Sequence, residues 1–138
     1  MKVIFLFFVA LAIISCASAP VPTSETKMVP TSRIYESRLL SPTGTDSGLV
    51  VIKRDAPYFG LNCANFIFVD GVKVAQIEPA ERLELYLSKT EHVLAVSRLP
   101  ACGGEIREVS VTPDPSAPKV FRVWVDPHGL LQFQRTAL

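Results

Sequence analysis

The hydrophobic and polar positions along this chain change pattern twice. Residues 3–14 form an unbroken apolar run, residues 17–47 are polar and rich in proline, and from Gly48 short apolar runs alternate with turn residues. In this last part, alternation at period two is typical of strands with one buried face. The pattern divides the chain into a leader (1–15), a polar segment (16–47) and one β-domain (48–138).

Eight short strands are expected in the β-domain, and no helix. They are the runs 49–54, 65–69, 72–76, 81–87, 91–98, 105–112, 119–125 and 130–134. Asp70-Gly71 is the strongest hairpin signal, because both residues tolerate the positive φ of a two-residue turn that would pair Val69 with Val72. The side chains expected in the core include Ile67, Val69, Val72, Val74, Leu83, Leu85 and Leu87. Turn signals every 8 to 12 residues or so predict a small antiparallel β-sandwich of about 7–8 strands.

The polar segment 16–47 lacks a sustained period. It holds Pro20, Pro22, Pro30 and Pro42 among many Ser and Thr residues. This composition predicts an extended, flexible tether that holds the domain clear of a surface. One exception is an apolar patch formed by Ile34, Tyr35, Leu39 and Leu40. This patch is a candidate for a short strand or helical turn that docks on the domain.

The leader has the features of a signal peptide. Lys2 supplies a positive charge, and the apolar run of about 12 residues is too short to span a bilayer, which needs about 20. Two cleavage sites compete. Ala17-Ser18-Ala19 has the small-x-small form, but Pro20 would then follow the cut, and its fixed φ makes a poor substrate. The other site lies before Cys16.

Ile13-Ile14-Ser15-Cys16 resembles the lipobox of bacterial lipoproteins: an aliphatic residue, a variable one, a small one and a cysteine. The resemblance implies a diacylglycerol on Cys16 and an acyl chain such as palmitate on the new N-terminus, and several chains anchor a protein stably. Ala17 rather than Asp follows, which in two-membrane bacteria implies an outer-membrane lipoprotein whose domain faces the periplasm. The alternative is an ordinary secreted protein with an unmodified cysteine.

Cys63 and Cys102 remain as an even pair if Cys16 carries the lipid. An oxidising compartment favours a disulfide between them. The closed loop of about 40 residues would make this bridge worth about 4 kcal/mol. Neither cysteine has the spacing of a redox motif or of a zinc site, so a structural disulfide is predicted.

The balance of charge bears on the partners. The chain has 14 basic and 13 acidic residues, and loss of Lys2 with the leader would leave 13 of each. A nucleic-acid surface needs a basic excess, so this class of partner is not expected.

The central block resembles a known family. Its residues are Phe66-Ile-Phe-Val-Asp-Gly-Val-Lys-Val-Ala75, Leu83-Glu-Leu-Tyr-Leu87 and His92-Val-Leu-Ala-Val96. They are similar to the small β-sandwich domains of the PEGA type and the related DUF2846-type bacterial lipoproteins, although Ala80 and Thr90 stand where that pattern has glycines. The resemblance implies a periplasmic all-β domain, with cell-wall glycan as one suggested ligand and no catalytic residues.

The sequence contains few candidates for catalytic or metal-binding residues. His92 and His128 lie about 36 positions apart without the further ligands a zinc site needs. A Ser-His-Asp triad is conceivable from composition, but no G-x-S-x-G elbow and no phosphate-binding loop occurs. No enzyme, cofactor or metal is therefore expected, and a hydrolase would need a polar cleft with a nucleophile near His92.

A binding role has more support than catalysis. Tyr58 and Phe59 lie in a loop before Cys63, and Trp124 lies on a strand, so these aromatic residues are candidate contacts to a ligand or partner. The alternative is that they pack in the core or cap its edge. We expect a non-enzymatic envelope lipoprotein that acts as an accessory or docking component of a cell-envelope assembly. The alternative is a peptidoglycan- or glycan-binding module. An exposed apolar patch would favour docking, and a groove lined by aromatic and amide side chains would favour glycan.

Overall fold

The computed structural model describes residues 18–57 and 63–137. Their strands are β1 (Ser18–Ala19), β2 (Lys27–Met28), β3 (Ser47–Arg54), β4 (Ala56–Pro57), β5 (Asn65–Val69), β6 (Val72–Ile77), β7 (Glu81–Ser88), β8 (His92–Arg98), β9 (Ile106–Val111), β10 (Lys119–Val125) and β11 (Leu131–Thr136). The described helical pieces are the short 3-10 turns η1 (Thr23–Glu25), η2 (Thr31–Arg33), η3 (Ser37–Leu40) and η4 (Pro100–Cys102). The all-β prediction is confirmed, and the eight expected strands appear within two residues of their predicted ends.

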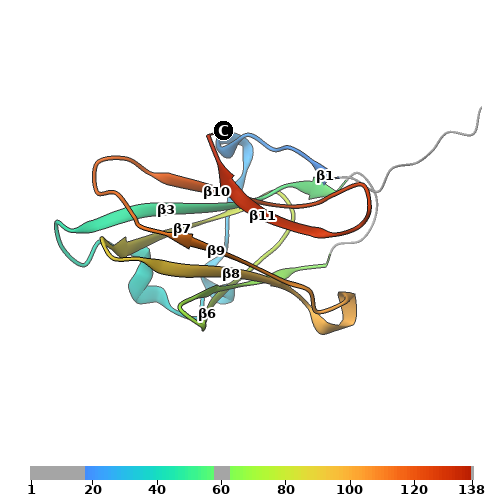
Figure 1. Cartoon of the computed structure of the whole chain (residues 1–138), viewed down its shortest axis with the longest axis horizontal. Helices are drawn as coiled ribbons and strands as arrows, with labels where there is room; N and C mark the ends of the chain where they lie inside the picture. The colour runs from blue at the N-terminus through green and yellow to red at the C-terminus, as the bar shows by residue number, and fades with distance from the viewer. Residues whose placement is uncertain (1–17, 58–62, 138) are drawn as a thin grey trace, which may run out of the picture.

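Two sheets form the layers of a sandwich (Figure 1). One has the order β11-β10-β3-β7-β2, the other β6-β5-β8-β9, and β1 pairs with β4 at one end. Their facing side chains make one core, to which Ile52, Leu85, Phe121, Ile67 and Val96 contribute fully buried side chains. Within the described residues, no helix is long and apolar enough to cross a membrane.

Two pairings differ from the predicted antiparallel arrangement: β10 lies parallel to β3, and β2 lies parallel to β7. The first arises because the proline-rich loop after β9 crosses between the sheets and enters beside the start of β3, so that Lys119 pairs with Val50. Gly48 permits this crossing, since a Cβ there would lie 2.7 Å from the Asp114 nitrogen. The strand pattern was readable from sequence, but the direction of pairing was not.

The β5–β6 hairpin turns at Asp70 and Gly71 as predicted. Their φ angles, 50° and 80°, are both positive, as a two-residue turn of this kind requires. Val69 pairs with Val72, but a bulge then shifts the register, so that Ile67 opposes Ala75 instead of Val74. Ile67, Val69 and Val74 are buried as expected, and so are Leu83, Leu85 and Leu87 of β7. Val72 is 49% exposed, so its predicted place in the core is wrong.

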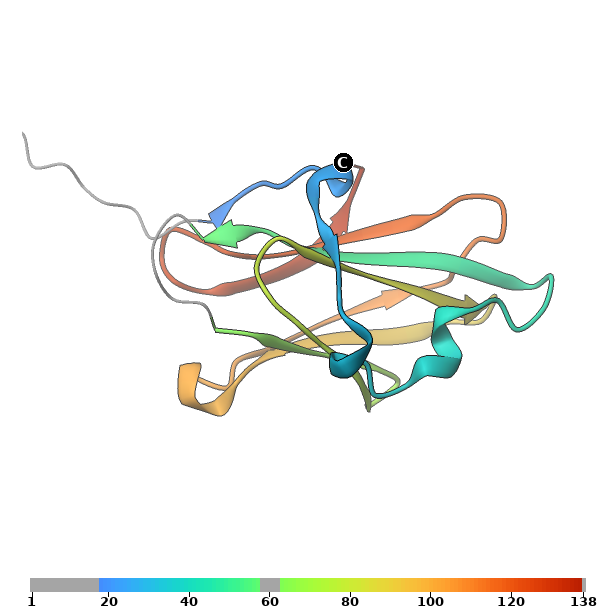
Figure 2. The same ribbon diagram turned by 180° about the vertical axis from the view of Figure 1, so that it is seen from behind.

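The N-terminal segment 18–40 lies on the sandwich, which corrects the predicted flexible tether for these residues (Figure 2). The Lys27 N–H donates to the Ala80 carbonyl at 3.0 Å, and the Val29 N–H donates to the Arg82 carbonyl at 2.9 Å, which extends the sheet beyond β7. The Val29 side chain is part of the core. Composition suggested a tether because isolated apolar residues and backbone hydrogen bonds leave no periodic pattern.

The same segment then reaches the second sheet. Ile34 forms an antiparallel bridge with Ala75, and the Tyr35 N–H donates to the Val74 carbonyl at 2.8 Å. Ile34, Leu39 and Leu40 pack against the core, which confirms that the apolar patch docks on the domain through a short helical turn, η3. The segment therefore covers the open side between β7 and β6, as a strap across both layers.

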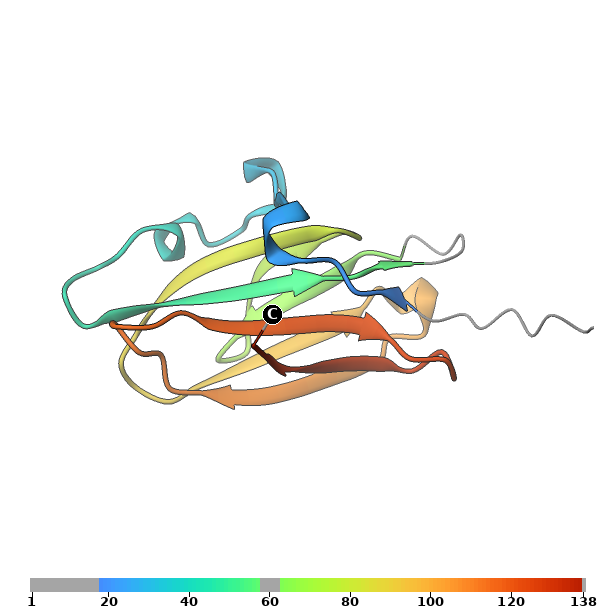
Figure 3. The same cartoon turned by 90° about the horizontal axis from the view of Figure 1, so that it is seen from above.

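The end of β3 buries three charged side chains, which belong to Lys53, Arg54 and Asp55. Lys53 Nζ donates to the Val21 carbonyl at 2.9 Å, and burial lowers the pKa of this amine. Burial also lowers the pKa of Arg54 to about 10. Arg122 Nε donates to Asp55 Oδ2 at 2.7 Å, and the Arg122 Nη2 nitrogen contacts the same oxygen. Figure 3 shows the N-terminal segment passing over β3 on the outer side of this sheet.

Cys63 and Cys102 are joined in a disulfide, with their Cα atoms 6.2 Å apart, as predicted from the number of cysteines. The bond ties the residues before β5 to η4, which follows β8. For a separation of 39 residues, the loss of unfolded-state entropy makes such a bond worth about 4 kcal/mol. It holds one end of the four-stranded sheet together.

Candidate functional site

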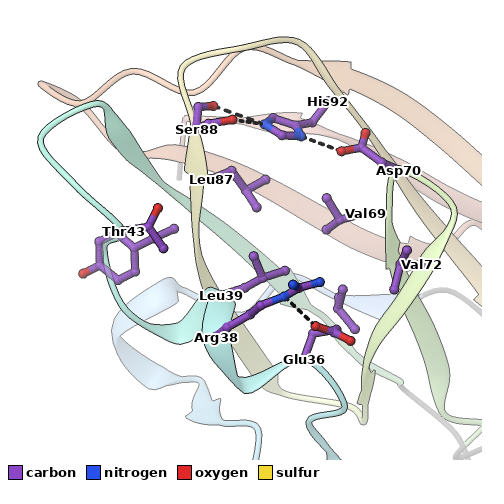
Figure 4. A pocket seen from close by; sticks show the side chains of 12 residues that line it. Glu36, Arg38, Leu39, Thr43, Val69, Asp70, Val72, Leu87, Ser88 and His92 are labelled. Atoms are coloured by element: carbon purple, nitrogen blue, oxygen red, sulfur yellow. Dashed lines mark hydrogen bonds and ion pairs between the residues drawn. The ribbon is translucent and has the colours of Figure 1, made fainter.

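A groove opens between η3, the β5–β6 hairpin and the end of β7, with a volume of about 300 Å³ (Figure 4). We call it the η3 groove. Its lining residues are Glu36, Arg38, Leu39, Thr43, Val69, Asp70, Val72, Val74, Tyr86, Leu87, Ser88 and His92. They come from segments that are far apart in sequence, and the strap supplies one wall.

The surface of the η3 groove is mainly apolar. Val69, Val74 and Leu87 are buried core residues that form its floor, and Leu39 packs beside them from η3. Val72 stands at the rim with half of its surface exposed, because it directly follows the hairpin turn and borders the open groove. Opposite this valine, Glu36 and Arg38 form an ion pair at 2.9 Å. The groove therefore offers an apolar floor with a charged rim.

A hydrogen-bonded chain of polar side chains lies along the upper rim in Figure 4. His92 Nδ1 lies 2.6 Å from Asp70 Oδ2, and His92 Nε2 lies 3.0 Å from Ser88 Oγ. Nε2 is also 3.3 Å from Thr90 Oγ1. The second oxygen of Asp70 accepts a hydrogen bond from the Val93 N–H at 2.9 Å. These contacts fix the imidazole between the hairpin tip and the β7–β8 turn.

The hydrogen bonds along this rim favour the ionised form of the Asp70 carboxylate. The hydrogen bond from His92 lowers the pKa of Asp70, and the Val93 N–H adds to the effect, because both donors stabilise the charged form. The Asp70 side chain is half exposed, whereas the His92 ring is largely buried. With the carboxylate ionised, Nδ1 carries its proton toward Asp70, and Nε2 faces the hydroxyl groups of Ser88 and Thr90 and the Ser88 carbonyl oxygen, which lies 3.2 Å away.

Ser88, His92 and Asp70 are connected in the same sequence as the nucleophile, the general base and the orienting carboxylate of a catalytic triad. A hydrolase would need a nucleophile near His92, and Ser88 occupies such a position. The same contacts also have a structural use, since they fasten the Asp70-Gly71 turn to the neighbouring strand. Sequence could not bring these residues together, because their meeting depends on β5 pairing with β8, in which Val69 opposes Leu94.

The aromatic candidates from sequence do not line the η3 groove. Trp124 is partly buried on β10, and the Arg122 guanidinium lies 4.6 Å from the centre of its ring. Tyr58, Phe59 and Cys16 lie outside the described residues. His128 is exposed in the β10–β11 loop. In the part of the chain that the structure describes, no three His, Cys, Asp or Glu side chains are grouped to hold a metal ion.

No family model, no curated protein and no solved structure matches this chain. The resemblance to PEGA-type and DUF2846-type domains therefore stays a prediction.

The rim gives a prediction about acid stability. Asp70→Asn keeps the turn, since Asn also adopts positive φ, but removes the carboxylate charge. Because the pKa of Asp70 is lowered in the folded state, its contribution is fully present above the unfolded value of about 3.9 and is lost as the pH falls through the folded value. We expect wild type to be more stable than the variant at pH 6, by about 1 kcal/mol or less.

Urea unfolding of both proteins between pH 6 and pH 2 measures this difference in the free energy of unfolding. It should stay constant down to about pH 4 and then shrink toward acid. A difference that grows on acidification would contradict the assignment of the charged form to the hydrogen-bonded state.

Proposed function

We propose that this protein is a non-enzymatic, lipid-anchored component of the cell envelope that docks a partner protein in the η3 groove. The lipobox at Ile13-Ile14-Ser15-Cys16 supports the anchor. The Cys63–Cys102 bond suits an oxidising compartment, such as the periplasm. On this proposal the protein is an outer-membrane lipoprotein whose domain faces the periplasm.

The apolar floor of the η3 groove carries the docking proposal. At about 300 Å³, its volume is at the lower limit of small-molecule sites. It suits one or two large apolar side chains of a protein, which act as anchors at the centre of an interface. Val72 at the rim and Tyr35 outside the groove add exposed side chains to this surface, at 49% and 48%. The partner is therefore a protein segment with an apolar anchor rather than a free metabolite.

Glycan binding has weaker support. Sugar sites combine stacking aromatic rings with amide and acid groups. Among the described residues that line the groove, Tyr86 is the one aromatic side chain, and none carries an amide. The Trp124 ring is already stacked by Arg122. A peptidoglycan-binding module remains the alternative to a docking component.

A photo-crosslinking pair tests the docking site. A photoreactive residue at Val72 should form a discrete adduct in native envelopes, while the same residue at Ile106 serves as the control. Both positions are exposed, at 49% and 58%, and they lie on opposite edge strands of the same sheet. The partner identified in this way should bind purified wild type at least about tenfold more tightly than Val72→Asp, because a carboxylate buried without a partner costs more than 1.4 kcal/mol.

The binding of Ile106→Asp to the purified partner should remain close to that of wild type. Equal adducts at both positions, or equal affinities for the two variants, would contradict docking in the η3 groove. Sedimentation of the protein with purified peptidoglycan would instead favour the glycan alternative.

Hydrolysis of an ester is the second candidate, because Ser88, His92 and Asp70 form a connected chain beside an apolar groove. In that reaction Ser88 Oγ bonds to the carbonyl carbon while its proton passes to His92 Nε2. The proton then goes to the leaving alcohol as the C–O bond breaks, and water releases the acid by the same route. The acyl group would occupy the groove.

A fluorophosphonate probe decides between the two candidates, since it reacts with an activated serine and releases fluoride. Hydrolysis predicts labelling of the folded protein that is abolished in Ser88→Ala and retained in Thr90→Ala, the matched control on the same imidazole. Absence of labelling, or labelling that survives Ser88→Ala, would remove the hydrolase candidate and leave the rim as a structural clasp.

A further inference from the structure

The first described residue of the chain is already fixed to the sandwich. Ser18 pairs with Pro57 in the β1–β4 ladder, and the Val125 N–H donates to Ser18 Oγ at 3.0 Å. Three residues later, the Val21 carbonyl accepts a hydrogen bond from Lys53 Nζ, at 2.9 Å. From Ser18 onward, the chain therefore follows the body of the protein.

This attachment limits how far a lipid on Cys16 could stand from the domain. Cys16 precedes Ser18 by two positions, and a fully extended chain covers at most about 3.6 Å per residue. The reach from Cys16 to the sandwich is thus about 7 Å. A flexible tether of about 30 residues would instead leave the domain free to take any orientation within a few tens of ångströms.

We propose that the end of the sandwich formed by β1, β4 and the β10–β11 loop (126–130) rests on the lipid surface. We call it the anchor end. This inference rests on the proposed lipid anchor at Cys16. In Figure 1 the β10–β11 loop and β1 lie at the same end of the molecule, in agreement with the bond between Val125 and Ser18. The lipid bilayer itself is the partner that contacts the anchor end.

The β10–β11 loop suits contact with neutral lipid. Leu130 is 48% exposed near its tip, and Pro127 is also exposed. Asp126 holds the loop in shape, since its Oδ1 atom accepts hydrogen bonds from the N–H groups of His128 and Leu130 at 2.9 and 3.0 Å. Because the loop is held in shape, the exposed Leu130 and Pro127 enter the interface at little cost in entropy, and they need no anionic lipid.

The η3 groove lies at the other end. Strand β3 runs along the sandwich from Ser47, which pairs with Ser88 of the groove, to Arg54, which pairs with Val123 close to the anchor end. Its eight residues cover roughly 23 Å at 3.3 Å per step. The groove therefore points away from the membrane, toward a partner in the periplasm.

Quenching by nitroxide-labelled headgroups tests this orientation. The full-length lipidated protein is reconstituted in phosphatidylcholine vesicles with a fluorophore on a single new cysteine, either Leu130→Cys or Thr45→Cys. Both positions are exposed, Thr45 lies near the start of β3, and the cysteines at 63 and 102 are bonded to each other. We expect the fluorophore at position 130 to be quenched several-fold more strongly than the one at position 45.

A matched control inserts about 20 Gly and Ser residues between Ala17 and Ser18, which adds an average reach of about 25 Å. The difference in quenching should then largely disappear. Equal quenching at the two positions without the insert, or stronger quenching at position 45, would overturn the orientation and leave the anchor intact. Failure of the protein to float with the vesicles, as expected for Cys16→Ala, would overturn the lipid anchor and the orientation with it.

Discussion

The closure of the open side of the sandwich by the N-terminal strap is the constraint on which the rest of the structure depends. Edge strands expose backbone groups that must be paired or covered. Here the edge of β7 is paired by Lys27 and Val29, and the edge of β6 is met by Ile34 and Tyr35. The strap therefore bonds to both sheets at once, and its apolar side chains complete the core between them.

The groove and its orientation follow from this closure. The strap continues into η3, which brings Leu39 against Val69 and Leu87 and so forms one wall of the η3 groove. At its other end the strap is fixed at Ser18, which would keep the proposed lipid on Cys16 close to the sandwich. One segment thus builds the proposed docking site and sets the proposed direction in which that site faces.

The sequence predicted those features that depend on local pattern. Strand positions, the turn at Asp70-Gly71 and the pairing of Cys63 with Cys102 follow from alternation, backbone preference and cysteine count. The sequence could not predict features that depend on how strands far apart in the chain pair with one another. Val72 lies exposed beside the groove instead of in the core, and the pairing of β5 with β8 placed Asp70 beside His92. The part of the strap before Ile34 was also missed, because its contacts are made by single residues.

Amide hydrogen exchange of the strap tests this account most directly. The N–H groups of Lys27, Val29 and Tyr35 donate to the edges of β7 and β6. If the strap belongs to the cooperative fold, these amides should be protected to nearly the same free energy as those in the centre of β3. Exchange at the rate of an unprotected chain, with β3 still protected, would contradict it and restore the segment as a tether.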